Sequence, residues 1–386
     1  MKRLLKFAGV LLFIALSCVP LVVPDLVEKS MNEILPHAPY VISPEAQALH
    51  DSLFVADLHS DSLLWMRDLL RRSNIGHMDL PRLRKGNVAL QVFSATTKSP
   101  PDLNYERNEA EADDITLLAV VSLWPPRTWG SLYERANFQL DKLRRLEQRS
   151  ELTLVTTRGE LADVIARRES GEPAIAALYL IEGAHPLEGE IGKLDSLFEK
   201  GLRIAGLTHF FDNKLGGSLH GTSSAGLSGF GRDVVRRANE LGVIIDVAHA
   251  SPAMVEEVLE LSTRPVILSH GGLKGNCNSA RNLDDELLRR IAAAGGIIGI
   301  GFWDAAVCDP SPQGVVTAIR YAIDVLGVEH IALGSDYDGT VAVMFDTSEL
   351  AILTQTMLQS GFSETEIRAV MGDNVKRFLL DNLPED

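Results

Sequence analysis

The chain repeats one phrase from Ser52 onward, and this repetition constrains its fold more than any other feature. Each repeat has a short apolar, β-branched run, then a polar or glycine-rich loop, then an amphipathic segment rich in Leu, Arg and Glu. This alternation is typical of a parallel α/β sheet. Eight strands suffice for a closed (β/α)8 barrel of the TIM type, and we predict this α/β fold for residues 47–386. The candidate strands are Phe54–His59, Val88–Ala95, Ile175–Glu182, Arg203–His209, Val243–His249, Pro265–His270, Gly296–Phe302 and Ile331–Asp336.

Most of these strands end on a residue that can carry chemistry. The residues are His59, Glu182, His209, His249, His270 and Asp336. In a (β/α)8 barrel the active site is built from the C-terminal ends of the strands. One histidine at a strand end is usually a hydrogen-bonded structural residue. Four histidines and two acids at the same end of successive strands instead predict a functional site.

The spacing of these residues favours metal binding. His59 and Asp61 are two apart on an extended segment, so their side chains point the same way and can converge on one cation. Glu182 ends an apolar strand, where a buried carboxylate without a cation is costly, and its two oxygens can serve two metals. His249 and His270 end adjacent strands and supply two nitrogens to a second ion. Several imidazoles with carboxylates favour zinc, although manganese or cobalt can use the same ligands. We therefore expect two Zn²⁺ ions per chain.

Such a site predicts metal-assisted hydrolysis, because a water shared by two close cations has a pKa near neutrality. Asp336, in the segment Gly334-Ser-Asp-Tyr-Asp-Gly339, can take the proton of that water and return it to the leaving amine. Asp338 is a competing candidate, although its loop position favours a role in a turn. His209 can donate to the developing oxyanion, or can simply cap its strand.

Composition excludes some classes of function. The net charge of −15 argues against a nucleic-acid partner, because phosphate binding needs a basic face. The three cysteines, Cys18, Cys277 and Cys308, are too few and too widely spaced for a disulfide framework or a cysteine-based zinc site. One disulfide between Cys277 and Cys308 stays open.

The N-terminus predicts export. The basic start Met1–Lys6 precedes an uncharged apolar run from Phe7 to Val23, which is typical of an export signal or a signal anchor. We expect an uncleaved anchor over residues 1–24, with a lipoprotein cleaved before Cys18 and full secretion as the alternatives. Residues 25–46, with several prolines, are then a spacer. The catalytic domain is expected on the periplasmic or extracellular side, attached to the membrane through this segment.

Eight short segments in this order resemble the renal, or membrane, dipeptidase family of binuclear zinc peptidases. The resemblance runs from about Ser52 to Phe378. The segments are Asp57–Asp61, His77–Gly86, Ile181–Gly183, Leu207–His209, Asp246–Ser251, Leu268–His270, Ala280–Asn282 and Gly334–Gly339. Any one segment is weakly specific, whereas all eight in sequence are highly specific.

The resemblance implies roles for individual residues. One zinc would be held by His59 and Asp61, the other by His249 and His270, with Glu182 as the bridge. His209 would contact the substrate carbonyl or the tetrahedral intermediate, Asp336 would be the acid and base, and Arg281 would bind the C-terminal carboxylate. A guanidinium can hold a carboxylate through two parallel hydrogen bonds. The implied function is a zinc-dependent dipeptidase acting on dipeptides with a free C-terminal carboxylate, including those with a C-terminal D-residue.

Two other functions compete with this one. A related amidohydrolase would act on another amide, but many of those enzymes bridge their metals with a modified lysine at the end of strand four, where this chain has His209. A non-hydrolytic maturation or binding protein on the same fold would be favoured by the loss of a ligand, and none is missing. The insert Lys98–Asp113 and the loop after His209 depart from the family pattern, so substrate preference stays open. The expected partners are small dipeptides and the membrane, with a homodimer left open.

Overall fold

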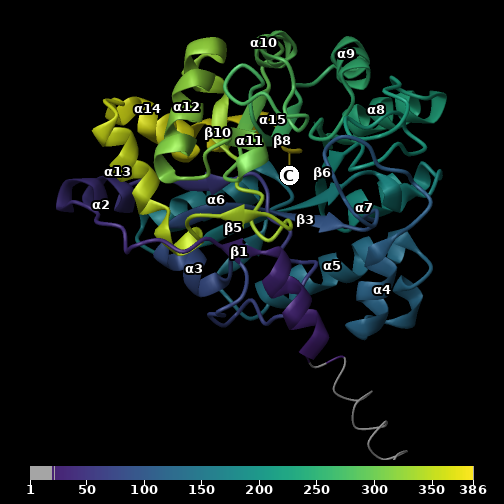
Figure 1. Ribbon diagram of the computed structural model, residues 1–386, viewed down its shortest axis with the longest axis horizontal. Coiled ribbons are helices and arrows are strands. Elements are labelled where there is room, and N and C mark those ends of the chain that lie inside the picture. Colours follow the sequence, from purple (N-terminus) through teal and green to yellow (C-terminus); the bar gives the residue numbers. More distant parts are fainter. Residues whose placement is uncertain (1–19, 21, 386) are drawn as a thin grey trace, which may run out of the picture.

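The protein is described here by a computed structural model that covers residue 20 and residues 22–385. At its centre, eight parallel strands form a closed barrel surrounded by helices (Figure 1). The barrel closes because β3 pairs with β5 and β10 pairs with β2. Its strands are β2 (Val55–Asp57), β3 (Val88–Thr96), β5 (Ile175–Glu182), β6 (Leu202–Gly206), β7 (Ile244–Asp246), β8 (Ile267–Gly271), β9 (Ile297–Ile300) and β10 (Ile331–Leu333). The predicted fold is confirmed.

Alternate side chains of the strands enter two different cores. On β5, Leu178 and Leu180 share a core with Ile244 and Ile297, which belong to strands that do not pair with β5. This core therefore fills the inside of the barrel, and residues of α15 (Asn374–Asn382) join it. The intervening Tyr179 packs in the outer core with the surrounding helices. Burial on both faces explains why the strands are continuously apolar.

The remaining helices follow the strands as the amphipathic segments predicted. Several begin at a Ser, Thr or Asp whose side chain accepts a hydrogen bond from the first turn, as Thr157 does for α6. The remaining helices, with and without such a cap, are α2 (Pro44–Asp51), α3 (Leu80–Lys85), α4 (Asp114–Val121), α5 (Leu132–Glu147), α6 (Arg158–Glu169), α7 (Gly192–Glu199), α8 (Gly229–Leu241), α9 (Pro252–Leu261), α10 (Asp285–Ala293), α11 (Asp304–Val307), α12 (Pro312–Leu326), α13 (Ala351–Gln359) and α14 (Glu364–Arg368).

The strands are shorter than predicted at several of their functional ends. The strands β6, β7 and β10 stop a few residues before His209, His249 and Asp336, so these three residues lie on loops. His249 and Asp336 have φ angles of 62° and 59°, in the left-handed region that a strand cannot contain. These loops follow the C-terminal strand ends, and the expected end of the barrel is unchanged.

Three short strands were not expected from the sequence. The strand β4 (Leu152–Leu154) pairs with the first part of β5, on the side that β6 occupies further along. The strands β1 (Glu33–Ile34) and β11 (Ala342–Val343) form a separate parallel pair. Each is only two or three residues long, too short to give a sequence period.

The segment that we expected to be a spacer, residues 25–46, packs on the barrel instead. Residues 22–31 are helical, and β1 and the start of α2 follow. Glu28 is buried and forms an ion pair with Arg67, which also pairs with Asp338. The hydrogen bond from Nε of Arg67 to Glu28 and the apolar contacts of Val27 hold the helix against the domain.

The expected membrane anchor, residues 1–24, lies almost entirely outside the described residues. Within the described part of the chain, none of the helices is long and apolar enough to span a bilayer. A disulfide joins Cys277 to Cys308, which have Cα atoms 5.4 Å apart. The pairing that the sequence left open is therefore present.

Candidate active site

The predicted site residues converge at the C-terminal end of the barrel, around one oxygen of Glu182. Its Oε1 atom lies 3.4 Å from Nε2 of His59, 3.3 Å from Nε2 of His249 and 3.5 Å from Nε2 of His270. All four side chains are buried. Strands β2, β5, β7 and β8 thus bring residues far apart in the sequence to one point, as the sequence predicted.

The second carboxylate of the site is held against the first. The Thr96 hydroxyl lies 2.8 Å from Oδ1 of Asp61 and 2.9 Å from Oε2 of Glu182, so it links the two groups. The Asp61 side chain also lies 3.7 Å from Nε2 of His59. On the other side, Nε2 of His209 lies 3.4 Å from Oε2 of Glu182. Thr96 ends β3 and was missed by the sequence reasoning, because a threonine at the end of an apolar strand carries no distinctive signal.

The donor atoms of these residues fit a binuclear metal site. Three groups have donor atoms within 4.8 Å of one another: His59 with Asp61 and Glu182, Glu182 with His209 and His249, and His59 with His270 and Asp336. The buried Nε2 of His59 has no hydrogen-bond partner among the described residues. The Nε2 atoms of His249 and His270 lie 2.8 Å apart. A buried ring nitrogen without a partner, and two ring nitrogens that face each other at short distance, are arrangements that divalent cations would satisfy.

The electrostatics of the site also favour cations. Burial alone would lower the pKa of His59, but Glu182 and the other carboxylates around it outweigh this effect and raise the pKa to about 10. Burial lowers the pKa of His249 and His270 well below the usual value. These two rings are therefore neutral, with a lone pair each, beside the carboxylate of Glu182.

Asp336 faces the same cluster from the loop after β10. Its Oδ1 lies 4.0 Å from Nε2 of His59, and its side chain is buried. The preceding residue, Ser335, donates from its backbone N–H and its hydroxyl to the buried carboxylate of Asp57, at 2.8 and 2.7 Å. The competing candidate, Asp338, accepts instead from the backbone N–H of His77, and also from Ser62 and Arg67. Its carboxylate therefore serves structure, in line with the turn role that the sequence favoured.

Arg281 lies buried beside the cluster with donors to spare. One of its terminal nitrogens donates to the His270 carbonyl at 2.7 Å, and its guanidinium lies 5.5 Å from the Trp303 ring centroid. Its Nε has no partner, and no carboxylate among the described residues lies within ion-pair distance of it. Trp303 in turn donates from its Nε1 to the Tyr105 hydroxyl at 2.9 Å. The sequence reasoning missed Trp303 and Tyr105, although Trp303 follows the end of β9 and Tyr105 lies in the insert 98–113.

His185, three residues after Glu182 in the sequence, does not join the cluster. Its ring stacks on Phe211 at 4.7 Å between centroids, and its Nδ1 lies 3.4 Å from the side-chain nitrogen of Asn213. Burial lowers its pKa to about 3. The ring is therefore a neutral packing residue in this structure.

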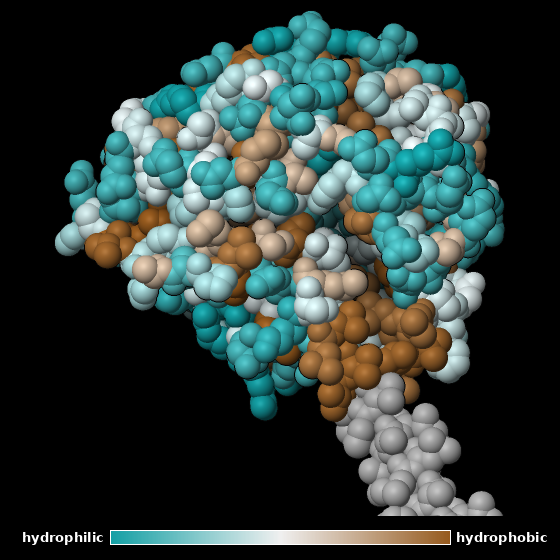
Figure 2. All heavy atoms as spheres, in the orientation of Figure 1, coloured by the Kyte–Doolittle hydropathy of each residue, from teal (hydrophilic) through white to brown (hydrophobic). Residues whose placement is uncertain are grey.

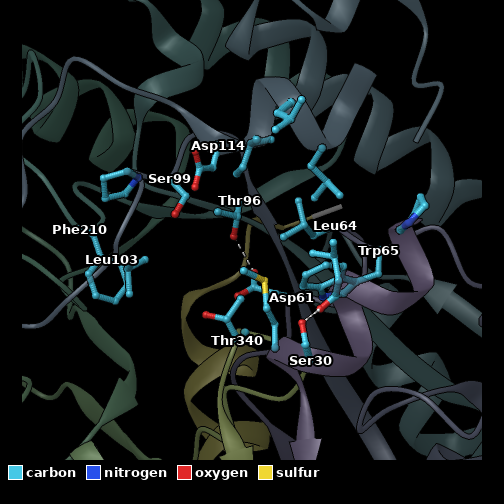
Figure 3. A pocket seen from close by; sticks show the side chains of 18 of the residues that line it. Ser30, Asp61, Leu64, Trp65, Thr96, Ser99, Leu103, Asp114, Phe210 and Thr340 are labelled. Atoms are coloured by element: carbon cyan, nitrogen blue, oxygen red, sulfur yellow. Dashed lines mark hydrogen bonds between the residues drawn. The ribbon is translucent and has the colours of Figure 1, made fainter. Parts of the chain in front are cut away.

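A cavity of about 720 Å³ adjoins the cluster. Asp61 and Thr96 lie on its inner side, and the labelled side chains in Figure 3 show Leu64 and Phe210 around the same space. Its outer wall is mostly apolar and comes from residues 23–31 and from α4. The site can therefore take a small molecule with one polar end at the cluster and an apolar part toward this wall.

Comparisons with known proteins agree with this geometry. Residues 43–382 match the family described as Membrane dipeptidase (Peptidase family M19). Dipeptidase verJ of Clonostachys rogersoniana is 30% identical over 325 residues, which cover 82% of this chain and 78% of the relative. Mouse Dipeptidase 3 is 29% identical over 356 residues, which cover 86% of this chain and 65% of the relative.

Solved structures share the fold. A metallopeptidase from Rhodobacter sphaeroides, liganded with a phosphinate mimic of the dipeptide L-Ala-D-Ala, has a TM-score of 0.66 at 23% identity, and the match covers 86% of this chain and 99% of that one. The metallopeptidase dipeptidase AC has a TM-score of 0.67 at 24% identity with the same coverage. From the match over nearly all of the described chain and the central cluster of side chains that fits a metal site, it follows that this protein is a metallodipeptidase belonging to the membrane dipeptidase family.

Proposed function

We propose that this chain is a zinc-dependent dipeptidase that holds two Zn²⁺ ions and cleaves dipeptides with a free C-terminal carboxylate. The observation that carries the proposal is the convergence of three imidazoles on Oε1 of Glu182, next to a buried arginine that has no carboxylate partner among the described residues. His59 and Asp61 would hold one ion, His249 and His270 the other, and Glu182 would bridge them. Imidazole and carboxylate donors without thiolates support zinc.

Individual residues of the chain would then have separate roles in the reaction. When bound, two zinc ions would supply a water of lowered pKa and positive charge for the substrate carbonyl. Asp336 would take the proton of the attacking water at its carboxylate and deliver it to the leaving amine. His209, on the far side of Glu182, would donate a hydrogen bond to the developing negative charge. Its Nδ1 lies 3.4 Å from the Lys98 carbonyl, an orientation that leaves Nε2 directed at the site.

Arg281 would set the length of the substrate. Its guanidinium would bind the C-terminal carboxylate, since a buried cation gains most from an anion that arrives with the ligand. A fixed anchor at that end leaves room for one residue before the scissile bond. We include dipeptides with a C-terminal D-residue, because the Rhodobacter sphaeroides relative is liganded with a mimic of one.

The test combines metal analysis with a substrate panel. The purified chain is expected to carry about two zinc ions and to lose activity on chelation. It should hydrolyse L,L- and L,D-dipeptides, and fail on tripeptides, N-blocked dipeptides and C-terminal amides. A metal-free chain with full activity, or equal rates on dipeptides and their amides, would contradict the proposal. Activity on cyclic amides alone would favour the amidohydrolase alternative.

We further propose that the catalytic domain is exported and attached to a membrane by its N-terminal segment. Lys2, Arg3 and Lys6 would stay on the cytoplasmic side, because positive residues resist translocation. The disulfide between Cys277 and Cys308 supports an oxidising compartment. A reporter fused after Asp386 should be active only outside the cytoplasm. If Cys18→Ser abolishes acyl labelling, the chain is a lipoprotein; an unlabelled wild type that stays in the membrane fraction favours the uncleaved anchor.

A further inference from the structure

Exposed apolar side chains gather on one face of the molecule. Of the ten large apolar side chains exposed in the described part of the chain, six lie on the helix over residues 22–31 or on α4 and the residues after it. They form the brown area beside the grey N-terminal atoms in Figure 2. We call these six residues the apolar face: Val22, Leu26, Met31, Leu117, Val120 and Leu123.

The two elements of this face form one surface. Val27 of the first helix and Leu118 of α4 pack against the same small core, which contains Trp65 and Trp124. Met31 and Leu117 both line the cavity that leads to the candidate active site. Leu117 and Leu123 are 66% and 68% exposed, although a surface helix of a water-soluble domain normally turns such side chains inward. The α4 sequence, Asp114-Ile-Thr-Leu-Leu-Ala-Val-Val121, is apolar on every side after its first residues.

We propose that this face lies against the interfacial layer of a lipid bilayer. The chain continues directly from the apolar run Phe7–Val23 into the helix over residues 22–31, without an intervening linker. Nine residues of helix separate Met31 from Val22, which is about 13 Å along the axis. If the run is in the membrane, the whole face is therefore within reach of the headgroup region.

The attraction is hydrophobic in origin. The net charge of −15 opposes binding to anionic lipids, so lipid charge does not provide the attraction. Apolar contact is then the driving force, and a zwitterionic bilayer is a sufficient partner for the apolar face. Because Leu117 and Met31 also line the cavity, docking places the mouth of the cavity at the level of the headgroups. The proposal rests on the proposed N-terminal membrane attachment and is independent of the substrate.

Photo-crosslinking on the full chain tests the proposal. The photoreactive residue benzoylphenylalanine replaces Leu26, Leu123 or, as a control, the exposed Ala293 on α10, at the opposite end of the molecule in Figure 1. The chain is reconstituted in phosphatidylcholine vesicles with a radiolabelled lipid. Position 123 is decisive, since it lies on a different element from the membrane-proximal helix. We expect at least tenfold more lipid adduct at positions 26 and 123 than at position 293.

Four other results would overturn the proposal, and each points to a different cause. A crosslinked dimer at position 123 means that a second copy covers the face, and an adduct with residues 1–21 means that the chain's own N-terminus does. Lipid adduct at position 26 alone means that only the first helix meets the bilayer. If the chain leaves the membrane fraction altogether, the proposed attachment fails as well. Unchanged zinc content in the three variants verifies that each is folded.

Discussion

The hydroxyl of Ser269 lies 2.6 Å from the carboxylate of Asp246 and gives its single proton to it. The same oxygen lies 3.2 Å from Nδ1 of His59 and 2.9 Å from Nδ1 of His270, so toward these rings it can only accept. Both imidazoles are therefore held with a proton on Nδ1, which leaves Nε2 as the atom of each ring that would bind a cation. One serine thus orients a ligand of each proposed zinc ion.

Replacing this serine should weaken metal binding without removing a ligand. In Ser269→Ala the two rings lose the acceptor that fixes their tautomer, and zinc affinity is expected to fall about 10- to 100-fold. Competition with a fluorescent chelator measures the change. The matched control is Ser94→Ala, because the buried Ser94 hydroxyl has no hydrogen-bond partner in the described part of the chain. Equal affinities in the two variants would show that the tautomers are fixed by other contacts.

Removing a proposed ligand should have a larger effect. His249→Ala is expected to reduce the zinc content from about two ions to about one and to lower hydrolysis at least about 100-fold. His185→Ala, which removes a nearby buried ring that stacks on Phe211, should keep both ions. Metal analysis and initial rates on one dipeptide report both effects. Equal losses would mean that the ligands are wrongly assigned.

Arg281 should determine the need for a free carboxylate. Arg281→Ala is expected to lower kcat/KM on free dipeptides about 30- to 1,000-fold, on the order of 2–4 kcal/mol, because a charge-assisted contact in a buried site is lost. Wild type and variant should be similarly poor on C-terminal amides. Arg281→Lys should recover only part of the loss, since an ammonium lacks the two-pronged geometry. Near-normal kcat/KM in the alanine variant, with both metals bound, places the carboxylate contact elsewhere.

Docking of the N-terminal helix should depend on pH through Glu28. Burial raises the pKa of Glu28 from 4.5 to about 7, although the Arg67 guanidinium opposes this. Between pH 4.5 and about 7, the Glu28 carboxyl keeps its proton in the docked helix but loses it in the undocked helix. The free energy of docking therefore becomes less favourable as the pH rises through this range, and stays constant above about pH 7. Hydrogen-exchange protection of residues 22–31, corrected for intrinsic rates, should fall about 10- to 100-fold from pH 5 to pH 8. Glu28→Gln should remove this dependence, whereas α12 should show none in either protein.

The disulfide should stabilise the part of the site that holds Arg281. It joins the loop after β8, which carries Arg281, to α11, which follows Trp303. Its loop of 31 residues predicts a loss of about 3–4 kcal/mol in the free energy of unfolding for the double variant Cys277→Ala, Cys308→Ala. Urea unfolding measures the loss. We also expect a severalfold higher KM for free dipeptides at unchanged zinc content; an unchanged KM would limit the bond to a role in stability.

The barrel and the positions of its site residues were predictable from the sequence, because both are written in local patterns. An apolar run followed by a polar residue marks a strand and its C-terminal end, and closing eight such strands brings the ends together. His59, Glu182 and His270 therefore meet without any feature beyond their place in the repeat. Their roles as zinc ligands stay predictions.

The supporting contacts depended on tertiary structure. Ser269 and His59 are 210 residues apart, and the sequence holds no sign that a serine on one strand accepts from a histidine that follows another strand. The contacts of Thr96 with Asp61 and of Trp303 with Tyr105 likewise join residues that lie far apart in the sequence. The left-handed backbone of His249 and Asp336 is likewise set by the loops that hold them.

The sequence by itself determined the strands, the end of the barrel that carries chemistry and the residue types gathered there, since each follows from short-range periodicity. Tertiary structure alone decided that residues 22–31 are a wall of the cavity and no spacer. That outcome depends on a buried contact between Glu28 and Arg67, 39 positions apart. The two side chains meet only when the barrel is closed, a condition that local sequence does not contain.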